Sequence, residues 1–130
     1  MTINNTLKIL TVSIGVAAGG FATGTALAQD VNRGQKLFEE CAACHSPDRD
    51  AKDMVGPSLF GVAGRKAGDA TEFRFSPAMK RSNITWTRES LNEFVADPQK
   101  VVPGNRMPYS GMPDGKSRAD LIAYLLNAMK

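Results

Sequence analysis

Apolar residues recur at helical spacing in three separate stretches of the chain. In residues 31–42 they fall on one side of a helix that Asp30 can cap. After Thr87, a good N-cap residue, three apolar side chains share one helical face, and Pro98 ends that helix. These three side chains are Leu91, Phe94 and Val95. The pattern therefore predicts two helices before residue 100.

The third stretch runs to the C-terminus. Residues 117–120 indicate a capping box of the Ser-x-x-Asp type, which opens a last helix. The apolar stripe of this helix consists of Leu121, Tyr124, Leu125 and Ala128. The segments between the three helices, residues 46–81 and 103–113, are rich in Gly and Pro and lack an alternating strand pattern. We expect ordered loops there, with a short helix around residues 77–82.

The first 28 residues have the order of an export signal. Lys8 is the only charge in this segment, an apolar centre follows it, and small residues end in Ala26-Leu27-Ala28. We expect export to the bacterial periplasm and cleavage after this motif, which leaves residues 29–130 as one domain. Cleavage removes Lys8 and lowers the formal net charge from +3 to +2. The alternative is an uncleaved membrane anchor facing the periplasm, because residues 9–28 are uncharged and about 20 residues span a bilayer.

Composition narrows the possible function classes. The 130 residues contain 16 Lys and Arg against 13 Asp and Glu without a basic block, which argues against nucleic-acid binding as the main role. The two Cys and the one His all fall in Cys41-Ala42-Ala43-Cys44-His45. This excludes several disulfides, a His-rich metal site and any Ser-His-Asp mechanism that needs a second His. Short helices and long loops supply little core, so we expect a large apolar prosthetic group.

Cys-x-x-Cys-His is the attachment motif of c-type haem. Two thiols add to the two vinyl groups of the porphyrin, a helical turn places both sulfurs on one side, and His45 then ligates the iron. The alternatives explain less of the sequence. A redox dithiol is expected beside a βαβ unit, a zinc site needs four ligands, and a plain disulfide leaves the single His and the loops unexplained.

From residue 30 onward the chain resembles the class I cytochromes c, the mitochondrial type and its bacterial relatives. The motifs that carry the resemblance are Gly34 and Phe38 before the pentapeptide, Gly56-Pro57-Ser58-Leu59-Phe60-Gly61, Gly64-Arg65-Lys66, Ile84-Thr85-Trp86, Pro103-Gly104-Asn105-Arg106-Met107 and Asp120-Leu121-Ile122-Ala123-Tyr124-Leu125. The resemblance implies an all-α fold in which three main helices and long ordered loops wrap one haem c. That haem is attached through Cys41 and Cys44, and the first helix packs on the last.

The second axial ligand is expected to be a methionine, because the chain has no second His. Met107 stands in a rigid loop between Pro103-Gly104 and Pro108, and it matches the position of the ligand methionine in the family. Met112, five residues later in the same loop, is the competing candidate. We expect His45 and Met107 to ligate the iron, which leaves no open coordination position.

The resemblance also implies roles for three more residues. The Pro57 carbonyl accepts a hydrogen bond from the outer ring N–H of His45, the Trp86 indole N–H faces a haem propionate, and Arg65 lies near the propionates. The alternatives are that Trp86 is only a core residue and Arg65 only a solvated loop residue. Two tyrosines of the mitochondrial type are replaced here, by Phe75 and Phe94.

These expectations combine into a one-electron carrier that is not an enzyme. It shuttles electrons between redox protein partners, a membrane oxidase or reductase complex or a dehydrogenase, in a respiratory or related chain. We expect a monomer without nucleic-acid partners or small-molecule substrates. The alternatives are a haem subunit permanently bound to a dehydrogenase or oxidase, and a ligand-binding or peroxidase-like haem protein.

A net charge of +2 after cleavage predicts weak electrostatic steering toward those partners. The basic residues available around the haem edge are Lys36, Lys52, Lys66, Lys100, Arg106 and Lys116. We therefore expect the docking face to depend on apolar contacts, and the candidates are Ala43, Pro108, Tyr109 and Met112. The alternative is that these residues only cover the haem pocket.

Overall fold

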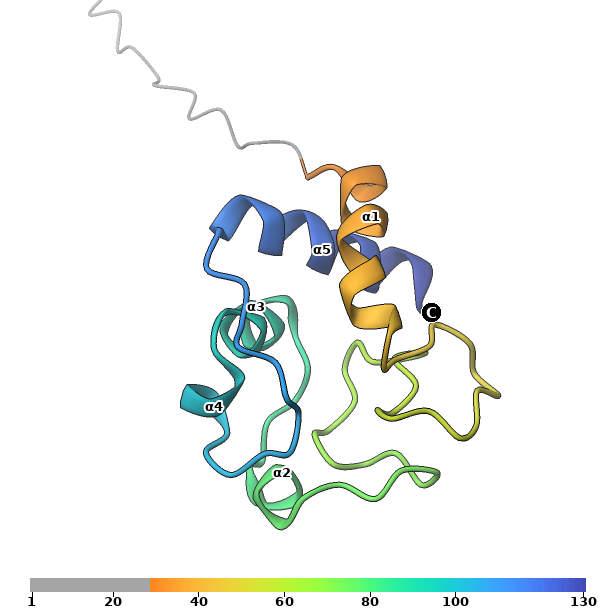
Figure 1. Ribbon diagram of the computed structural model, residues 1–130, viewed down its shortest axis with the longest axis vertical. Coiled ribbons are helices and arrows are strands. Elements are labelled where there is room, and N and C mark those ends of the chain that lie inside the picture. Colours follow the sequence, from red (N-terminus) through yellow and green to blue (C-terminus); the bar gives the residue numbers. More distant parts are fainter. Residues whose placement is uncertain (1–28) are drawn as a thin grey trace, which may run out of the picture.

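The computed structural model describes residues 29–130 (Figure 1), so the export-signal expectation for residues 1–28 lies outside the described residues. Its helices are α1 (Val31–Ala42), α2 (Pro77–Arg81), α3 (Arg88–Ala96), α4 (Pro98–Val101) and α5 (Gly115–Ala128). Within residues 29–130 the extended pairing is limited to one isolated bridge between Lys66 and Thr85. None of the described helices is long and apolar enough to cross a membrane. The all-α class with three main helices, α1, α3 and α5, is confirmed.

Helices α1 and α5 cross at close range (Figure 1). The approach requires a glycine, because a Cβ atom at Gly34 would overlap with the backbone carbonyl of Asp120. One turn further along α1, the rings of Phe38 and Tyr124 lie with their centroids 5.5 Å apart. Leu121 belongs to the same buried cluster as Phe38. This crossing fixes the C-terminal end of α1, where the Cys-x-x-Cys-His motif begins.

The expected capping box at residues 117–120 is wrong. Helix α5 begins three residues earlier, and its N-cap is Asp114, whose carboxylate accepts the Ser117 backbone N–H at 2.7 Å. Asp120 lies inside the helix and is only 1% exposed. Its carboxylate accepts hydrogen bonds from the Asp30 backbone N–H at 2.9 Å, from Arg33 at 3.0 Å and from Lys116 at 3.2 Å. The Asp120 side chain therefore joins the start of α1 to α5 and is not available as a cap partner.

The segment around α3 begins as predicted and ends with an additional helix. The Thr87 hydroxyl accepts the Ser90 backbone N–H at 3.3 Å, and α3 ends before Asp97. The apolar pattern does not predict α4. Pro98 takes its first position, where a missing N–H does no harm, and the Asp97 carboxylate accepts the Lys100 N–H at 3.1 Å. Pro98 therefore separates two helices, where the sequence predicts only the end of one.

Buried side chains form two clusters with a cavity between them. The first cluster consists of Val62, Ala67, Met79, Trp86, Leu91, Phe94, Val102 and Ile122. The second lies at the crossing of α1 and α5 and consists of Phe38, Val95, Met112, Leu121, Leu125 and Met129. Residues of both clusters line the cavity, so neither cluster completes the core on its own.

Candidate cofactor site

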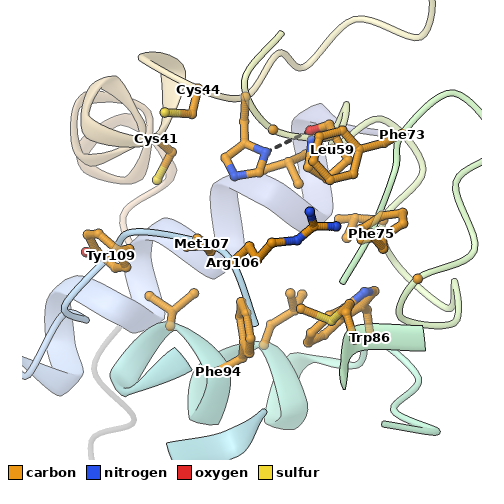
Figure 2. Close-up of a pocket in the computed structure, with 18 of the residues that line it drawn as sticks. Cys41, Cys44, Leu59, Phe73, Phe75, Trp86, Phe94, Arg106, Met107 and Tyr109 are labelled. Carbon is orange, nitrogen blue, oxygen red and sulfur yellow. Dashed lines mark hydrogen bonds between the residues drawn. The ribbon is translucent and has the colours of Figure 1, made fainter. Parts of the chain in front are cut away.

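The cavity has a volume of about 410 Å³, within the range of roughly 300–1,000 Å³ that is usual for ligand and cofactor sites. Helices α1, α2, α3 and α5 each supply part of its wall, and loops supply the rest (Figure 2). Most of the wall is apolar, with side chains such as Leu59, Val62, Phe73, Phe75, Leu91 and Phe94. The structure places all the site residues expected from the sequence in this one wall: Cys41, Cys44, His45, Pro57, Arg65, Trp86 and Met107.

Cys41 and Cys44 lie side by side at the C-terminal end of α1 as free thiols (Figure 2). The backbone N–H groups of Cys44 and His45 both donate to the Cys41 carbonyl, at 3.0 and 2.8 Å. This tight turn brings two sulfur atoms and an imidazole to the same cavity. Burial and the negative charge of Glu40 raise the pKa of Cys41 to about 11, so this thiol is protonated at neutral pH.

The His45 ring is held by its neighbours in the following loop. Its Nδ1 atom lies 2.7 Å from the Pro57 carbonyl oxygen, a hydrogen bond drawn dashed in Figure 2. A Cβ atom at Gly56 would lie 2.6–3.0 Å from three atoms of the ring, so this position has room only for glycine. Burial lowers the pKa of His45, against the opposing effect of the Pro57 hydrogen bond. With the proton on Nδ1, Nε2 keeps the lone pair that a metal ligand needs.

Of the two methionines that compete as ligands, Met107 lines the cavity and Met112 does not. Met112 is 8% exposed and packs with Phe38 and Leu125 in the second cluster. Its burial also corrects the expected docking face, because a buried side chain cannot contact a partner. Met79 lines the cavity as well, but it packs in the first cluster and is also 8% exposed.

Trp86 and Arg65 both support the wall of the cavity. Trp86 packs edge-on against Phe94, with ring centroids 5.0 Å apart, and its backbone N–H donates to the Arg65 carbonyl at 2.9 Å. The Arg65 guanidinium donates to the carbonyls of Phe60 and Ser58, both at 3.0 Å, and its burial lowers its pKa. Arg65 therefore braces residues 58–60 and is not simply a solvated loop residue. The propionate contacts expected for Trp86 and Arg65 stay predictions.

Two further features of the wall were not among the expected site residues. The Arg106 guanidinium donates to the Arg74 carbonyl at 3.1 Å, which links the loop of Met107 to the loop before α2. Beside it, Phe73 and Phe75 pack edge to face with centroids 4.9 Å apart. Arg106 precedes Met107 in the sequence, and this position could have predicted that Arg106 also lies in the wall of the cavity. Phe73 carries no such signal, because its contact depends on how the long loop folds.

The residues present fit a haem c. The wall contains two thiols for covalent attachment, one imidazole nitrogen and the thioether of Met107, which are the groups that hold such an iron, and a second thioether at Met79. A flat apolar group between the two buried clusters would join them into one core. Among the described residues there is no group of three or more His, Cys, Asp or Glu side chains that could hold a metal ion, so a zinc site is not a competitor there.

Known proteins resemble this chain over most of its described part. The Cytochrome c family profile matches residues 31–128. Cytochrome c2 of Rhodoblastus acidophilus is 48% identical over 98 residues, which cover 75% of this chain and 92% of the relative. Cytochrome c2 of Blastochloris viridis is 43% identical over 100 residues, which cover 77% of this chain and 79% of the relative. The solved structure of cytochrome cH from Methylobacterium extorquens matches with a TM-score of 0.70 and 45% identity, over 75% of this chain and 97% of that one.

Proposed function

Because the chain belongs to the cytochrome c family, we propose that it carries single electrons between redox proteins, with His45 and Met107 as the axial ligands of its iron. The family carries covalently attached haem c with His/Met ligation, and Cys41 and Cys44 are the attachment positions in this chain. Haem c supplies one iron that alternates between the ferric and ferrous states and thus one transferable electron.

The observation that carries the proposal is the presence of His45 and Met107 in the wall of one cavity. The Pro57 carbonyl orients the imidazole, and Gly56 leaves room for it. With both axial positions taken by protein side chains, no position is left for a substrate or a gas. The apolar wall keeps water away from the site, which is one of the means by which a protein sets a redox potential.

The proposed partners are redox proteins, either a membrane oxidase or reductase complex or a dehydrogenase. The proposed compartment is the bacterial periplasm, with residues 29–130 as the mature protein. The support for export is the order of charge, apolar centre and small residues in the first 28 positions. N-terminal sequencing of the protein from a periplasmic fraction is expected to begin at Gln29. A protein that retains Met1 in the membrane fraction would favour the anchor.

A redox titration of the purified holoprotein, followed by visible spectroscopy, tests the proposed function. The proposal predicts a one-electron curve and a weak far-red charge-transfer band in the ferric form, which reports sulfur on the iron. It also predicts that carbon monoxide does not bind the ferrous protein at neutral pH, because the sixth position is filled. Rapid binding of carbon monoxide and no far-red band would instead indicate the ligand-binding alternative.

A further inference from the structure

Asn105 is a buried amide in a loop that is otherwise open to solvent. It is 6% exposed, whereas Pro103, Gly104, Arg106 and Pro108 are all exposed. We propose that Asn105 is the positioning residue of Met107: it holds the loop that carries the thioether against α4. This inference rests on the proposed function, in which Met107 is an iron ligand.

All three hydrogen bonds of the Asn105 side chain are made with main-chain groups. Its Nδ2 atom donates to the carbonyls of Pro98 and Val102, at 2.8 and 2.9 Å. Its Oδ1 atom accepts the Met107 backbone N–H at 2.9 Å. A primary amide offers two donors and an acceptor in one plane, which is what these three contacts require. One side chain therefore connects two carbonyls of α4 and its C-cap to the backbone of Met107.

The residues that Asn105 contacts on the α4 side are buried. Pro98 is among the most deeply buried side chains, less than 2% exposed, and Val102 is 3% exposed in the first cluster. The Asp97 carboxylate caps the same helix through the Lys100 N–H at 3.1 Å. Asn105 therefore connects the Met107 backbone to buried residues of the core, and not only to its exposed neighbours in the loop.

The contacts of Asn105 order the loop that carries the flexible Met107 side chain before this side chain binds a metal. Met107 has no helical hydrogen bonds, since it lies in the loop between α4 and α5. A ligand on a loop that moves freely must be ordered each time it binds, and this opposes ligation. A loop held in place beforehand avoids that loss, as functional sites generally require of their supporting contacts. Asn105 thus favours the state in which Met107 stays on the iron.

Gln99 provides a matched control. It is exposed, it lies in the same helix as the carbonyl of Pro98, and its side chain also binds this loop. Its Nε2 atom donates to the Asn105 carbonyl at 3.0 Å, and its Oε1 atom accepts the Gly104 N–H at 3.3 Å. None of its hydrogen bonds involves Met107. Gln99→Ala therefore removes two hydrogen bonds to this loop, where Asn105→Ala removes three, and it keeps the link to the ligand residue.

The experiment uses native-state hydrogen exchange and the ferric far-red band of holoprotein variants. In Asn105→Ala, protection of the Met107 amide is expected to fall by roughly tenfold relative to core amides such as Ile122, and the band is expected to weaken. Asn105→Ser keeps a hydroxyl that can accept the Met107 N–H, so we expect intermediate values for both readouts. Gln99→Ala is expected to leave both unchanged.

The proposal is overturned if Asn105→Ala lowers protection of Met107 and of the core amides by the same factor while the band keeps its intensity. That result would make Asn105 a general stabilising residue only. If Asn105→Ala does not yield folded holoprotein, Asn105→Ser is compared with Gln99→Ala in its place. Equal exchange protection of the Met107 amide in these two variants contradicts the proposal. If Met107→Ala retains the far-red band, Met107 is not the iron ligand and the proposed function is wrong at that point. Hydrogen exchange of the Met107 amide still tests whether Asn105 holds the backbone of this loop.

Discussion

The two sides of the cavity hold their iron ligands by different means. His45 stands at the end of α1, where backbone groups of Cys41 and Pro57 fix the turn and the ring, and two cysteines provide covalent attachment beside it. Met107 stands in a loop, and its backbone is held by the side chain of Asn105. The position of His45 thus depends on main-chain groups, and the backbone of Met107 on the Asn105 side chain, which reaches α4.

Substitutions on the two sides of the cavity are therefore expected to have different effects. A substitution on the His side alters attachment and folding together, because α1 carries Cys41 and packs against α5, and Cys44 lies in the turn that follows α1. A substitution on the Met side alters the occupancy of the sixth position and leaves the fold largely intact.

Removing both cysteines breaks the His side completely. The double variant Cys41→Ala/Cys44→Ala is expected to yield almost no covalent holoprotein, and its apoprotein is expected not to unfold cooperatively, because the two buried clusters stay separated. Haem staining on a denaturing gel and thermal circular dichroism measure the two effects. A folded apoprotein with the thermal stability of the holoprotein would contradict the role of the haem as part of the core.

Gly56→Ala disturbs the His side while it leaves the cysteines in place. The added Cβ would stand 2.6 Å from the His45 ring, so ring or backbone must shift. We expect the free energy of unfolding of the holoprotein to fall by about 1–3 kcal/mol, as for other overpacked sites. Denaturant titration measures it. Gly115→Ala in α5, where the nearest atom to the new Cβ is an Arg118 nitrogen at 3.6 Å, is the matched control and is expected to cause no loss.

Asp120→Asn weakens the support of α1 on α5. Hydrogen bonding, chiefly from the Asp30 backbone N–H, holds the pKa of Asp120 below its ordinary value. The carboxylate therefore stabilises the fold fully above the ordinary Asp pKa of about 3.9, and this contribution is lost as pH falls through the lower folded value. At pH 7 the variant is expected to be less stable by about 1 kcal/mol. Denaturant titrations from pH 7 to pH 3 should show the difference shrink below about pH 4; a difference that is constant with pH would contradict this role.

The smallest effect is expected from salt, because neither side of the cavity depends on surface charge. Of the basic residues expected around the haem edge, Lys116 does not line the cavity, and its charge is paired with the Asp120 carboxylate. Apolar side chains at the rim include Val55, which is 71% exposed and lines the cavity. Electron transfer to the isolated partner, followed by stopped flow, should slow less than about tenfold from low to physiological ionic strength. A hundredfold fall, on the order of what strong steering produces, would contradict this.

The sequence predicts the surroundings of His45 better than those of Met107. The physical reason is the separation along the sequence between the residues that are in contact. The turn of Cys41 to His45 and the start of α1 depend on residues a few positions apart, and such contacts leave motifs and caps in the sequence. The burial of Met112, the use of Asp120 and the bracing of residues 58–60 by Arg65 depend on distant partners. No local pattern reports such contacts, so Met112 was expected at the docking face and Asp120 in a cap.

The same reason explains what was missed around the Met ligand. Asn105 appears in the sequence only as part of a motif, and its role emerges from the carbonyls of Pro98 and Val102 that it contacts. The short α4 lacks a helical pattern of its own because it has only 4 residues. A helix of that length cannot show periodicity, although Asp97-Pro98 is a start signal.

One spectrum determines which methionine binds the iron. In the ferric holoprotein the weak far-red band reports the bond between sulfur and iron. We predict that Met107→Ala abolishes this band and lowers the redox potential, whereas Met112→Leu and Met79→Leu, which keep the volume of buried side chains, retain it. A band that survives in Met107→Ala and disappears in either leucine variant would contradict the account.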